Sequence, residues 1–240
     1  MICHRLLSLS PQRVFTKHWK LEAGGVHSAS HPIFQKMAAV WKKLTVVGDV
    51  ACGKTCLLLA FCKEQFPKCY EPTVFETYIN DTEVDGKSMK LMLFDVAGQR
   101  QGNYQHFRSL FYQGTSVILM CFSVDRPNAL QNILDIWIPE VKQFCPTAPI
   151  VLVATKKELR NDEGVLERLA TLEQEPIKTE EGKALAASIG AYAYLECSAK
   201  TNDGIERVLQ IIGQAAIQDG TKKKRKHHVF FRLFTCGQKQ

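Results

Sequence analysis

Short apolar runs alternate with amphipathic segments through the middle of this 240-residue chain. Strand-length runs occupy Lys43–Val47, Val117–Ser123, Ile150–Ala154 and Tyr192–Cys197. The second and third of them are apolar almost throughout, which is typical of parallel strands buried on both faces. Helical periodicity of the apolar residues predicts helices over Lys54–Glu64, Asn128–Phe144 and Asp203–Gln218.

A hairpin interrupts this alternation. Val84-Asp85-Gly86-Lys87 is a strong turn sequence between two further strands, the second of which is predicted over Met89–Phe94. The order of strands and helices predicts an α/β fold, with a doubly wound, six-stranded, mostly parallel sheet and helices on both faces. The charged segment 161–178 has apolar positions of its own and is predicted to form a short extra surface helix around Val165, Leu166, Leu169 and Leu172.

The first strand and the first helix flank Gly48-Asp49-Val50-Ala51-Cys52-Gly53-Lys54-Thr55, which fits the phosphate-binding loop. Such a loop aims successive backbone N–H groups and the start of a helix at a phosphate. Lys54 would reach the terminal phosphates, and the Thr55 hydroxyl would hold Mg²⁺. The alternative is a plain glycine turn, which the strand–loop–helix context disfavours.

A second candidate segment, Asp95-Val96-Ala97-Gly98-Gln99, follows the hairpin. An Asp at a strand end can bind Mg²⁺ through water, a following Gly lets its N–H approach a γ-phosphate, and a Gln can orient an attacking water. Ligands of doubly wound sheets lie at the carboxyl ends of the strands. The sequence therefore predicts that this segment and the phosphate loop form one site.

The positive charge of the chain belongs to its ends. Residues 1–43 carry seven Lys or Arg and one acid, and residues 221–240 carry seven and none, so the middle is acidic although the formal net charge is +7. This distribution argues against a nucleic-acid-binding domain and points to a membrane surface or a targeting function. We expect residues 1–41 to be a disordered extension, 42–218 one folded domain, and 219–240 a basic tail.

The nine cysteines contain no CxxC pair and no metal-type spacing, which indicates reduced thiols in a cytosolic protein. Cys52 lies inside the phosphate loop, where the local field could lower its pKa, but a packed structural thiol is the favoured interpretation. The basic N-terminus weakly resembles a mitochondrial presequence, and it would also suit a start at Met37. No apolar run approaches the roughly 18 residues of a membrane-spanning helix.

Five ordered motifs resemble those of small GTPases of the Ras superfamily, and of the Rho family within it. Pro72-Thr73-Val74-Phe75-Glu76 resembles the first switch, and Asp95–Gln99 the second. Thr155-Lys156-Lys157-Glu158 lies where the guanine-specificity motif belongs, and Glu196-Cys197-Ser198-Ala199-Lys200 resembles the segment that contacts the guanine carbonyl. The insertion at 161–178 also looks Rho-like, and the resemblance runs from about Lys42 to Ile217.

The resemblance implies a monomeric G domain that binds GTP or GDP with Mg²⁺ and changes shape when the γ-phosphate is lost. Thr55, Thr73 and Asp95 would hold the metal, and Lys54, Thr73 and Gln99 would serve hydrolysis. Lys156 would pack along the guanine, and Glu158 would face its N1 and N2 hydrogens. The implied nucleotide contacts are Gly48, Asp49, Val50, Ala51, Cys52, Gly53, Lys54, Thr55, Cys56, Tyr70, Thr73, Asp95, Ala97, Gly98, Thr155, Lys156, Glu158, Ser198, Ala199 and Lys200.

The resemblance also implies effector proteins that bind through residues 70–78 and 98–112, in signalling of the actin-cytoskeletal type. Lys222–Lys226 resembles the basic run before a prenylated Cys, but Cys236 is fifth from the end rather than fourth, so prenylation is not predicted. Residues 222–234 combine this run with an aromatic segment, which predicts peripheral binding to the anionic inner face of the plasma membrane. A solvated tail and a nuclear-localisation signal are the alternatives.

Two residues of the site depart from the family pattern. The family usually has Gly at the position of Val50, and a branched side chain there would fill space needed by the Gln99 amide and by a partner's arginine finger. We expect slow hydrolysis and a GTP-biased state, unless the loop relaxes around the valine. Glu158 replaces Asp, which displaces the carboxylate by on the order of 1 Å and predicts weaker guanine binding. Thr155 replaces Asn, as in some Rho-family members.

The second switch departs as well, because Arg100–Tyr104 contains about two extra residues and changes the charge, and Val96 replaces Thr. Exchange factors and activating proteins of the Rho type are therefore expected to recognise this protein poorly. Three functions remain in view: a hydrolysing switch, a non-hydrolysing Rho-like scaffold that presents Thr73–Thr77 to partners, and a P-loop kinase. The sequence offers neither the substrate lid nor the basic acceptor site of a kinase.

Overall fold

The computed structural model describes residues 40–63, 66–67, 72–99 and 104–218. By its internal contacts the chain divides into Met1–Lys36 and Met37–Gln240, and all described residues belong to the second unit. The expected basic tail, Tyr70 and residues 100–103 lie outside the described residues, as does the expected extension except for its last two residues.

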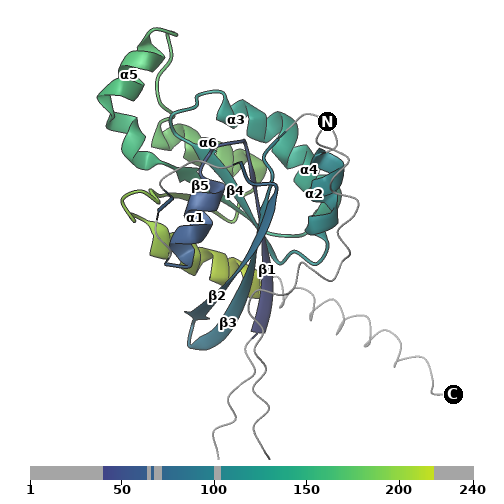
Figure 1. The fold of residues 1–240 in the computed structure, drawn as a ribbon. Helices are drawn as coiled ribbons and strands as arrows, with labels where there is room; N and C mark the ends of the chain where they lie inside the picture. Colours follow the sequence, from purple (N-terminus) through teal and green to yellow (C-terminus); the bar gives the residue numbers. More distant parts are fainter. Residues whose placement is uncertain (1–39, 64–65, 68–71, 100–103, 219–240) are drawn as a thin grey trace, which may run out of the picture. The chain divides into compact units, whose positions relative to one another are not determined.

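A six-stranded sheet forms the centre of the domain, in the order β2-β3-β1-β4-β5-β6. Only β2 pairs antiparallel, with β3, and the other neighbours are parallel. The predicted α/β fold with one antiparallel hairpin strand is thus confirmed (Figure 1). The strands are β1 (Val40–Gly48), β2 (Phe75–Val84), β3 (Lys87–Val96), β4 (Val117–Ser123), β5 (Ile150–Thr155) and β6 (Ala193–Glu196).

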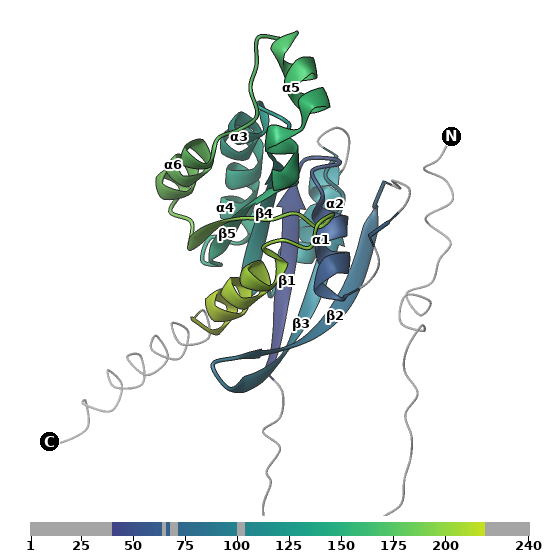
Figure 2. The same ribbon diagram turned by 90° about the vertical axis from the view of Figure 1, so that its left-hand side faces the viewer.

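Helices cover both faces of the sheet (Figure 2). One face packs against α1 (Lys54–Phe61) and the helix 205–218, and the other against α2, α3, α4 and α6. Alternate residues of β4 serve the two cores: Val117, Leu119 and Cys121 face the first and Ile118, Met120 and Phe122 the second. The remaining helices are α2 (Tyr104–Tyr112), α3 (Ala129–Asn132), α4 (Ile138–Phe144), α5 (Glu163–Ala170) and α6 (Thr179–Ile189).

The observed elements refine several predicted boundaries. β1 spans Val40–Gly48 rather than Lys43–Val47, because Val40 and Trp41 continue the pairing with β3. α1 ends at Phe61 rather than Glu64, since Cys62 and Lys63 already form a turn. The predicted helix Asn128–Phe144 is split into α3 and α4 by a π-helical turn at Ile133–Trp137.

The predicted surface helix is present as α5, which stands away from the sheet (Figure 1). Its first turn is capped by the Asp162 side chain, which accepts a hydrogen bond of 3.0 Å from the Val165 N–H. Leu169 is buried, whereas Leu166 and Leu172 remain exposed. Within the described ranges, the domain has no helix that combines the length and the apolar character needed to cross a bilayer.

Candidate functional site

The candidate residues gather at one edge of the sheet. Gly48 ends β1, Asp95 is the last but one residue of β3, and Thr155 ends β5. These strands run parallel within the sheet, so their carboxyl ends meet at the same edge. The described candidates at these strand ends therefore lie at one edge of the sheet.

The backbone of the phosphate loop has a shape that only particular residues allow. Gly48 has φ 141°, and a Cβ there would lie 2.1 Å from the carbonyl oxygen of Cys121. Gly53, which immediately precedes α1, has φ 93°, and Ala51 has φ 58°. Lys54 starts the helix, and its buried Nζ donates hydrogen bonds to the carbonyls of Gly48 (3.0 Å) and Asp49 (2.8 Å). The Lys54 side chain thus folds back toward the start of the phosphate loop.

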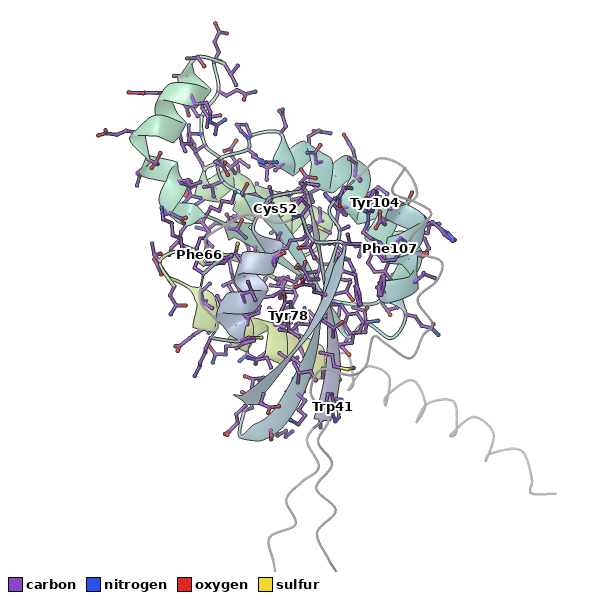
Figure 3. All side chains as sticks on the ribbon, in the orientation of Figure 1. Trp41, Cys52, Phe66, Tyr78, Tyr104 and Phe107 are labelled. Carbon is purple, nitrogen blue, oxygen red and sulfur yellow. The ribbon has the colours of Figure 1, made fainter. Side chains whose placement is uncertain are left out.

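The loop is anchored from the side of the π-helical turn. The Asp49 carboxylate accepts hydrogen bonds from Trp137 Nε1 (2.9 Å) and from Asn132 Nδ2 (2.6 Å). Cys52 is buried beneath the loop, inside the domain (Figure 3), and burial raises the pKa of its thiol despite the nearby Lys54. A raised pKa disfavours the reactive thiolate, in line with a packed structural thiol.

Three oxygen-bearing side chains converge beside the loop. Thr55 Oγ1 donates to Asp95 Oδ2 at 2.5 Å and lies 2.8 Å from Thr73 Oγ1. Asp95 is fully buried, and its pKa is raised by desolvation, although the hydrogen bond from Thr55 and the charge of Lys54 oppose this. Its Oδ1 is buried and has no hydrogen-bond partner among the described residues.

This oxygen cluster fits Mg²⁺. Magnesium prefers oxygen ligands and is usually held by one or two carboxylates together with substrate phosphates, so a single carboxylate beside a phosphate loop is a suitable set. The unpartnered Asp95 Oδ1 supplies a free acceptor at the right place.

The second switch begins directly against the phosphate loop. A Cβ on Gly98 would lie 2.6 Å from the Gly48 carbonyl oxygen and 2.7 Å from Lys54 Nζ, so this position has no room for a side chain. The Ala97 N–H donates to the Val74 carbonyl (3.2 Å), which joins the start of the second switch to the first. Gln99 follows, with its Oε1 buried and without a hydrogen-bond partner in the described part of the chain.

Val50 is half-buried. Together with Gly98 it lines a cavity of about 340 Å³ that extends to the loop after β4 and to α5. Arg126 Nη1 donates to the Val50 carbonyl at 3.0 Å from the wall of this cavity. Val50 and Gly98 therefore border the same cavity.

The other end of the site is a cavity of about 200 Å³ between α1 and the ends of β5 and β6. Phe66 belongs to its wall and lies beside α1 (Figure 3). One buried carboxylate oxygen, Glu158 Oε2, finds no hydrogen-bond partner in the described ranges. The sequence-predicted residues that line this cavity are Gly53, Cys56, Thr155, Lys156, Glu158, Ala199 and Lys200.

Two residues tie this cavity to the phosphate loop. Lys156 has φ 56°, and its Nζ donates to the Ala51 carbonyl at 2.9 Å. The buried Thr155 hydroxyl lies within hydrogen-bond distance of the Cys52 carbonyl and 3.0 Å from that of Phe122. Ser198 is fully buried, and its Oγ accepts a hydrogen bond from the Thr201 N–H (3.0 Å), which closes the turn that contains Ala199 and Lys200.

Sequence reasoning missed an ion pair next to the second switch. Arg108 in α2 and Glu140 in α4 are both buried, and two hydrogen bonds of 2.7 Å join them. Burial alone would lower the pKa of Arg108, but its hydrogen bonds to Glu140 outweigh burial and raise it. The one sequence feature that could have indicated this ion pair is the position of Glu140 between the apolar residues Ile138 and Val141. Phe66 was missed too, because a single aromatic residue after a helix predicts nothing specific.

Comparisons with known proteins agree with this geometry. The model of the Ras family matches residues 43–218. The chain is 57% identical over 182 residues to the human protein named Rho-related GTP-binding protein RhoB, an alignment that covers 76% of this chain and 92% of the relative. The proteins of the same name from Mus musculus and Rattus norvegicus show the same identity and coverage. The chain therefore belongs to the Ras family of small GTPases and is Rho-like within it.

Proposed function

We propose that the protein is a Rho-like signalling switch that binds GTP and GDP with Mg²⁺ and hydrolyses GTP slowly. The observation that carries this proposal is the convergence of Thr55, Thr73 and the unpartnered Asp95 Oδ1 beside the phosphate loop. A phosphate chain on the loop amides would lie against these oxygens, as a triphosphate with its metal requires.

The phosphate end of the site has the groups that a nucleotide switch needs. Lys54 is already inside the loop and would exchange its two carbonyl partners for phosphate oxygens. Bound Mg²⁺ would neutralise charge on the terminal phosphates, and Thr55, Thr73 and Asp95 would hold it. The Gly98 N–H would contact the γ-phosphate, and the Gln99 amide would orient the attacking water.

Val50 is the reason to expect slow hydrolysis. It shares with Gly98 the wall of the cavity on the outer side of the loop. A partner's arginine finger, which typically accelerates hydrolysis by about 10³–10⁵-fold, has to reach the γ-phosphate through space of this kind. The isopropyl group removes some of that space, so the GTP-bound form would persist.

The cavity of about 200 Å³ between α1 and the ends of β5 and β6, which we call the base end, favours guanine as the bound base. Glu158 presents a buried, unpartnered acceptor in a cavity that is mainly apolar elsewhere, which suits the two neighbouring N–H groups of guanine. The Thr155 hydroxyl lies within hydrogen-bond distance of carbonyls of the phosphate loop and of β4. The extra methylene of Glu158 displaces its carboxylate by on the order of 1 Å, so weaker binding than in relatives with Asp at this position is expected.

Nucleotide binding, effector binding and membrane binding would be carried by different parts of the chain. Residues 42–218 would form the nucleotide-binding domain, with effector contacts through 70–78 and 98–112. Residues 222–234 would hold the protein at an anionic membrane surface, where each Lys or Arg contributes about 1 kcal/mol. Exchange factors and activating proteins would meet an altered second switch, and residues 1–36 would be dispensable for nucleotide binding.

A non-hydrolysing scaffold is the second candidate, and Val50 and Glu158 favour it because each weakens one half of the enzymatic cycle. The full chain, purified and analysed for bound nucleotide, separates the two functions. Bound GTP with slow single-turnover hydrolysis that a Rho-type activating protein barely stimulates supports the switch. Strong stimulation contradicts the impaired hydrolysis, and the absence of any guanine nucleotide binding contradicts the proposal as a whole.

A further inference from the structure

All three guanidinium nitrogens of Arg108 donate hydrogen bonds, to the start of the second switch and to α4. Only 1% of the residue is exposed. Nε and Nη2 donate to the two oxygens of Glu140, each at 2.7 Å. Nη1 donates to the carbonyl of Ala97 at 3.2 Å and to that of Gln99 at 2.5 Å. The arginine therefore holds the carbonyls on both sides of Gly98.

The Ala97 carbonyl and the Gly98 N–H belong to the same peptide unit. No cis peptide bond occurs among the described residues, so the two groups point in opposite directions. A hydrogen bond that fixes this carbonyl toward α2 also fixes the N–H away from α2. Gly98 itself borders the phosphate loop, since a Cβ on it would lie 2.6 Å from the Gly48 carbonyl oxygen and 2.7 Å from Lys54 Nζ. Arg108 thus fixes the direction of the Gly98 N–H at a residue that borders the phosphate loop.

The other end of the ion pair is rigid as well. Glu140 is buried, and its Oε1 also accepts a hydrogen bond from the Tyr112 hydroxyl at 2.7 Å. The Arg108 guanidinium lies 4.9 Å from the centre of the Trp137 ring, whose Nε1 binds Asp49 of the phosphate loop. One helical segment thus fixes both the loop and, through Arg108, the peptide that faces it.

A purely structural role would not require this pair. Buried ion pairs contribute little net stability, because the desolvation of both charges offsets their attraction, and apolar replacements are often as stable. What the pair does provide is one defined direction for the peptide between Ala97 and Gly98.

We propose that Arg108 is a positioning residue for the γ-phosphate: by holding the Ala97 and Gln99 carbonyls it orients the Gly98 N–H, and it so sets the preference for GTP over GDP. This inference rests on the proposed nucleotide-binding function. GDP lacks the γ-phosphate, so its affinity does not depend on that N–H. The ratio of the two affinities therefore reports on the role of Arg108, whereas a general loss of stability weakens both nucleotides together.

Arg108→Lys in the full chain is the direct test. Lysine keeps the charge but cannot make two parallel bonds to a carboxylate and still reach two carbonyls. With Mg²⁺ present, we expect the affinity for the non-hydrolysable analogue GTPγS to fall about tenfold and that for GDP to change less than about twofold. Because GTPγS is used, the readout does not depend on the rate of hydrolysis.

Arg160→Lys is the matched control. Arg160 also forms two hydrogen bonds of 2.8 Å with a glutamate, Glu196, and one of 3.0 Å with a carbonyl, that of Ile177. It lies at the base end, so any change should affect GDP and GTPγS equally. A selective effect of Arg160→Lys, or an unchanged ratio in Arg108→Lys, overturns the inference.

Glu140→Gln provides a second variant in case the lysine variant does not fold. The amide keeps the shape and one acceptor but removes the charge, so the affinity ratio should fall by a smaller factor in the same direction. If both variants lose the folded domain, the pair is structural and the inference is wrong. If the unaltered chain binds neither nucleotide, the proposed function fails and this inference with it.

Discussion

The phosphate end and the base end of the site are built in opposite ways. At the phosphate end, Lys54 donates hydrogen bonds to two carbonyls, and Asp49 accepts hydrogen bonds from two side chains. Most polar groups of the phosphate end are thus held in place by the protein. At the base end, Thr155 and Lys156 reach back to the loop, while a largely apolar cavity leaves one oxygen of Glu158 without a partner.

This difference separates two functions. A prearranged phosphate end can report whether a terminal phosphate is present, since its groups move little on their own. An open base end with one unpartnered acceptor selects which base is bound. The two departures from the family pattern fall one at each end, Val50 and Glu158, so their effects should be separable by experiment.

The largest expected effect is that of Val50→Gly. Removal of the isopropyl group opens the cavity that Val50 shares with Gly98, and we expect GTP hydrolysis with a saturating concentration of a Rho-type activating protein, which offsets weak recognition of the second switch, to rise by about 10³-fold or more. Single-turnover assays measure the rate, and Val50→Ala should lie between the two. If the glycine variant stays slow while GTP remains bound, the altered second switch, and not Val50, limits the reaction.

Glu158→Asp tests the base end. Shortening the side chain by one methylene should restore two parallel hydrogen bonds to guanine and tighten GDP binding by about 10–100-fold. The hydrolysis rate of bound GTP should stay the same, because Glu158 lies at the opposite end from Gly98. Dissociation of a fluorescent GDP analogue gives the affinity change, and equal or weaker binding of GDP would show that the site is already adapted to glutamate.

Asp95→Asn examines the oxygen cluster at the phosphate end. The amide keeps one oxygen acceptor for Thr55 but loses the negative charge that attracts a divalent cation. We expect the Mg²⁺ concentration for half-maximal GDP retention to rise about tenfold, within the range typical when support of a metal ligand is lost. An unchanged Mg²⁺ requirement would remove Asp95 from the metal site.

The smallest expected effect concerns the ion pair of the base end. Burial tends to raise the pKa of Glu196, but hydrogen bonds from Arg160, Tyr194 and Thr179 outweigh it and lower that pKa below the ordinary 4.5. Stability from a carboxylate with a lowered pKa is complete above the unfolded-state pKa and is lost as the pH falls through the folded-state value.

Arg160→Gln should therefore lower the Tm at pH 7 by about 2–4 °C, which corresponds to about 1 kcal/mol for a domain of this size. The gap between variant and natural protein should close as the pH is lowered from 7 to 3. Thermal unfolding followed by circular dichroism at several pH values measures it. A gap that does not depend on pH would mean that Arg160 acts through its bond to Ile177 and not through Glu196.

Local patterns were enough to predict the sheet and the phosphate loop. The apolar runs that became β4 and β5, and the spacing of Gly48, Gly53 and Lys54, each carry their information within a few residues. α2 was not predicted, although Tyr104, Phe107 and Phe111 are at helical spacing, because the helix is only nine residues long and its two buried residues are Arg108 and Tyr112.

The partners of the site residues could not be predicted for a related reason. Arg108 and Glu140 are 32 positions apart, and Trp137 and Asp49 are 88 apart. Neither pair has a local signal, since a buried charge in a sequence looks the same as an exposed one until the fold brings its partner to it. Motifs thus located the site, and only the tertiary packing reveals what orients it.

The π-helical turn at Ile133–Trp137 also limits which insertions and deletions of residues the chain can accept at this place. In an α-helix two residues five apart point about 140° away from each other, whereas a turn closed by i→i+5 bonds brings them nearly into line. Asn132 and Trp137 are five apart and share one carboxylate, that of Asp49. Loss of one residue from this turn would leave a more regular helix but turn the Trp137 indole away from Asp49. The π-helical turn is therefore what allows Asn132 and Trp137 to donate hydrogen bonds to the same carboxylate.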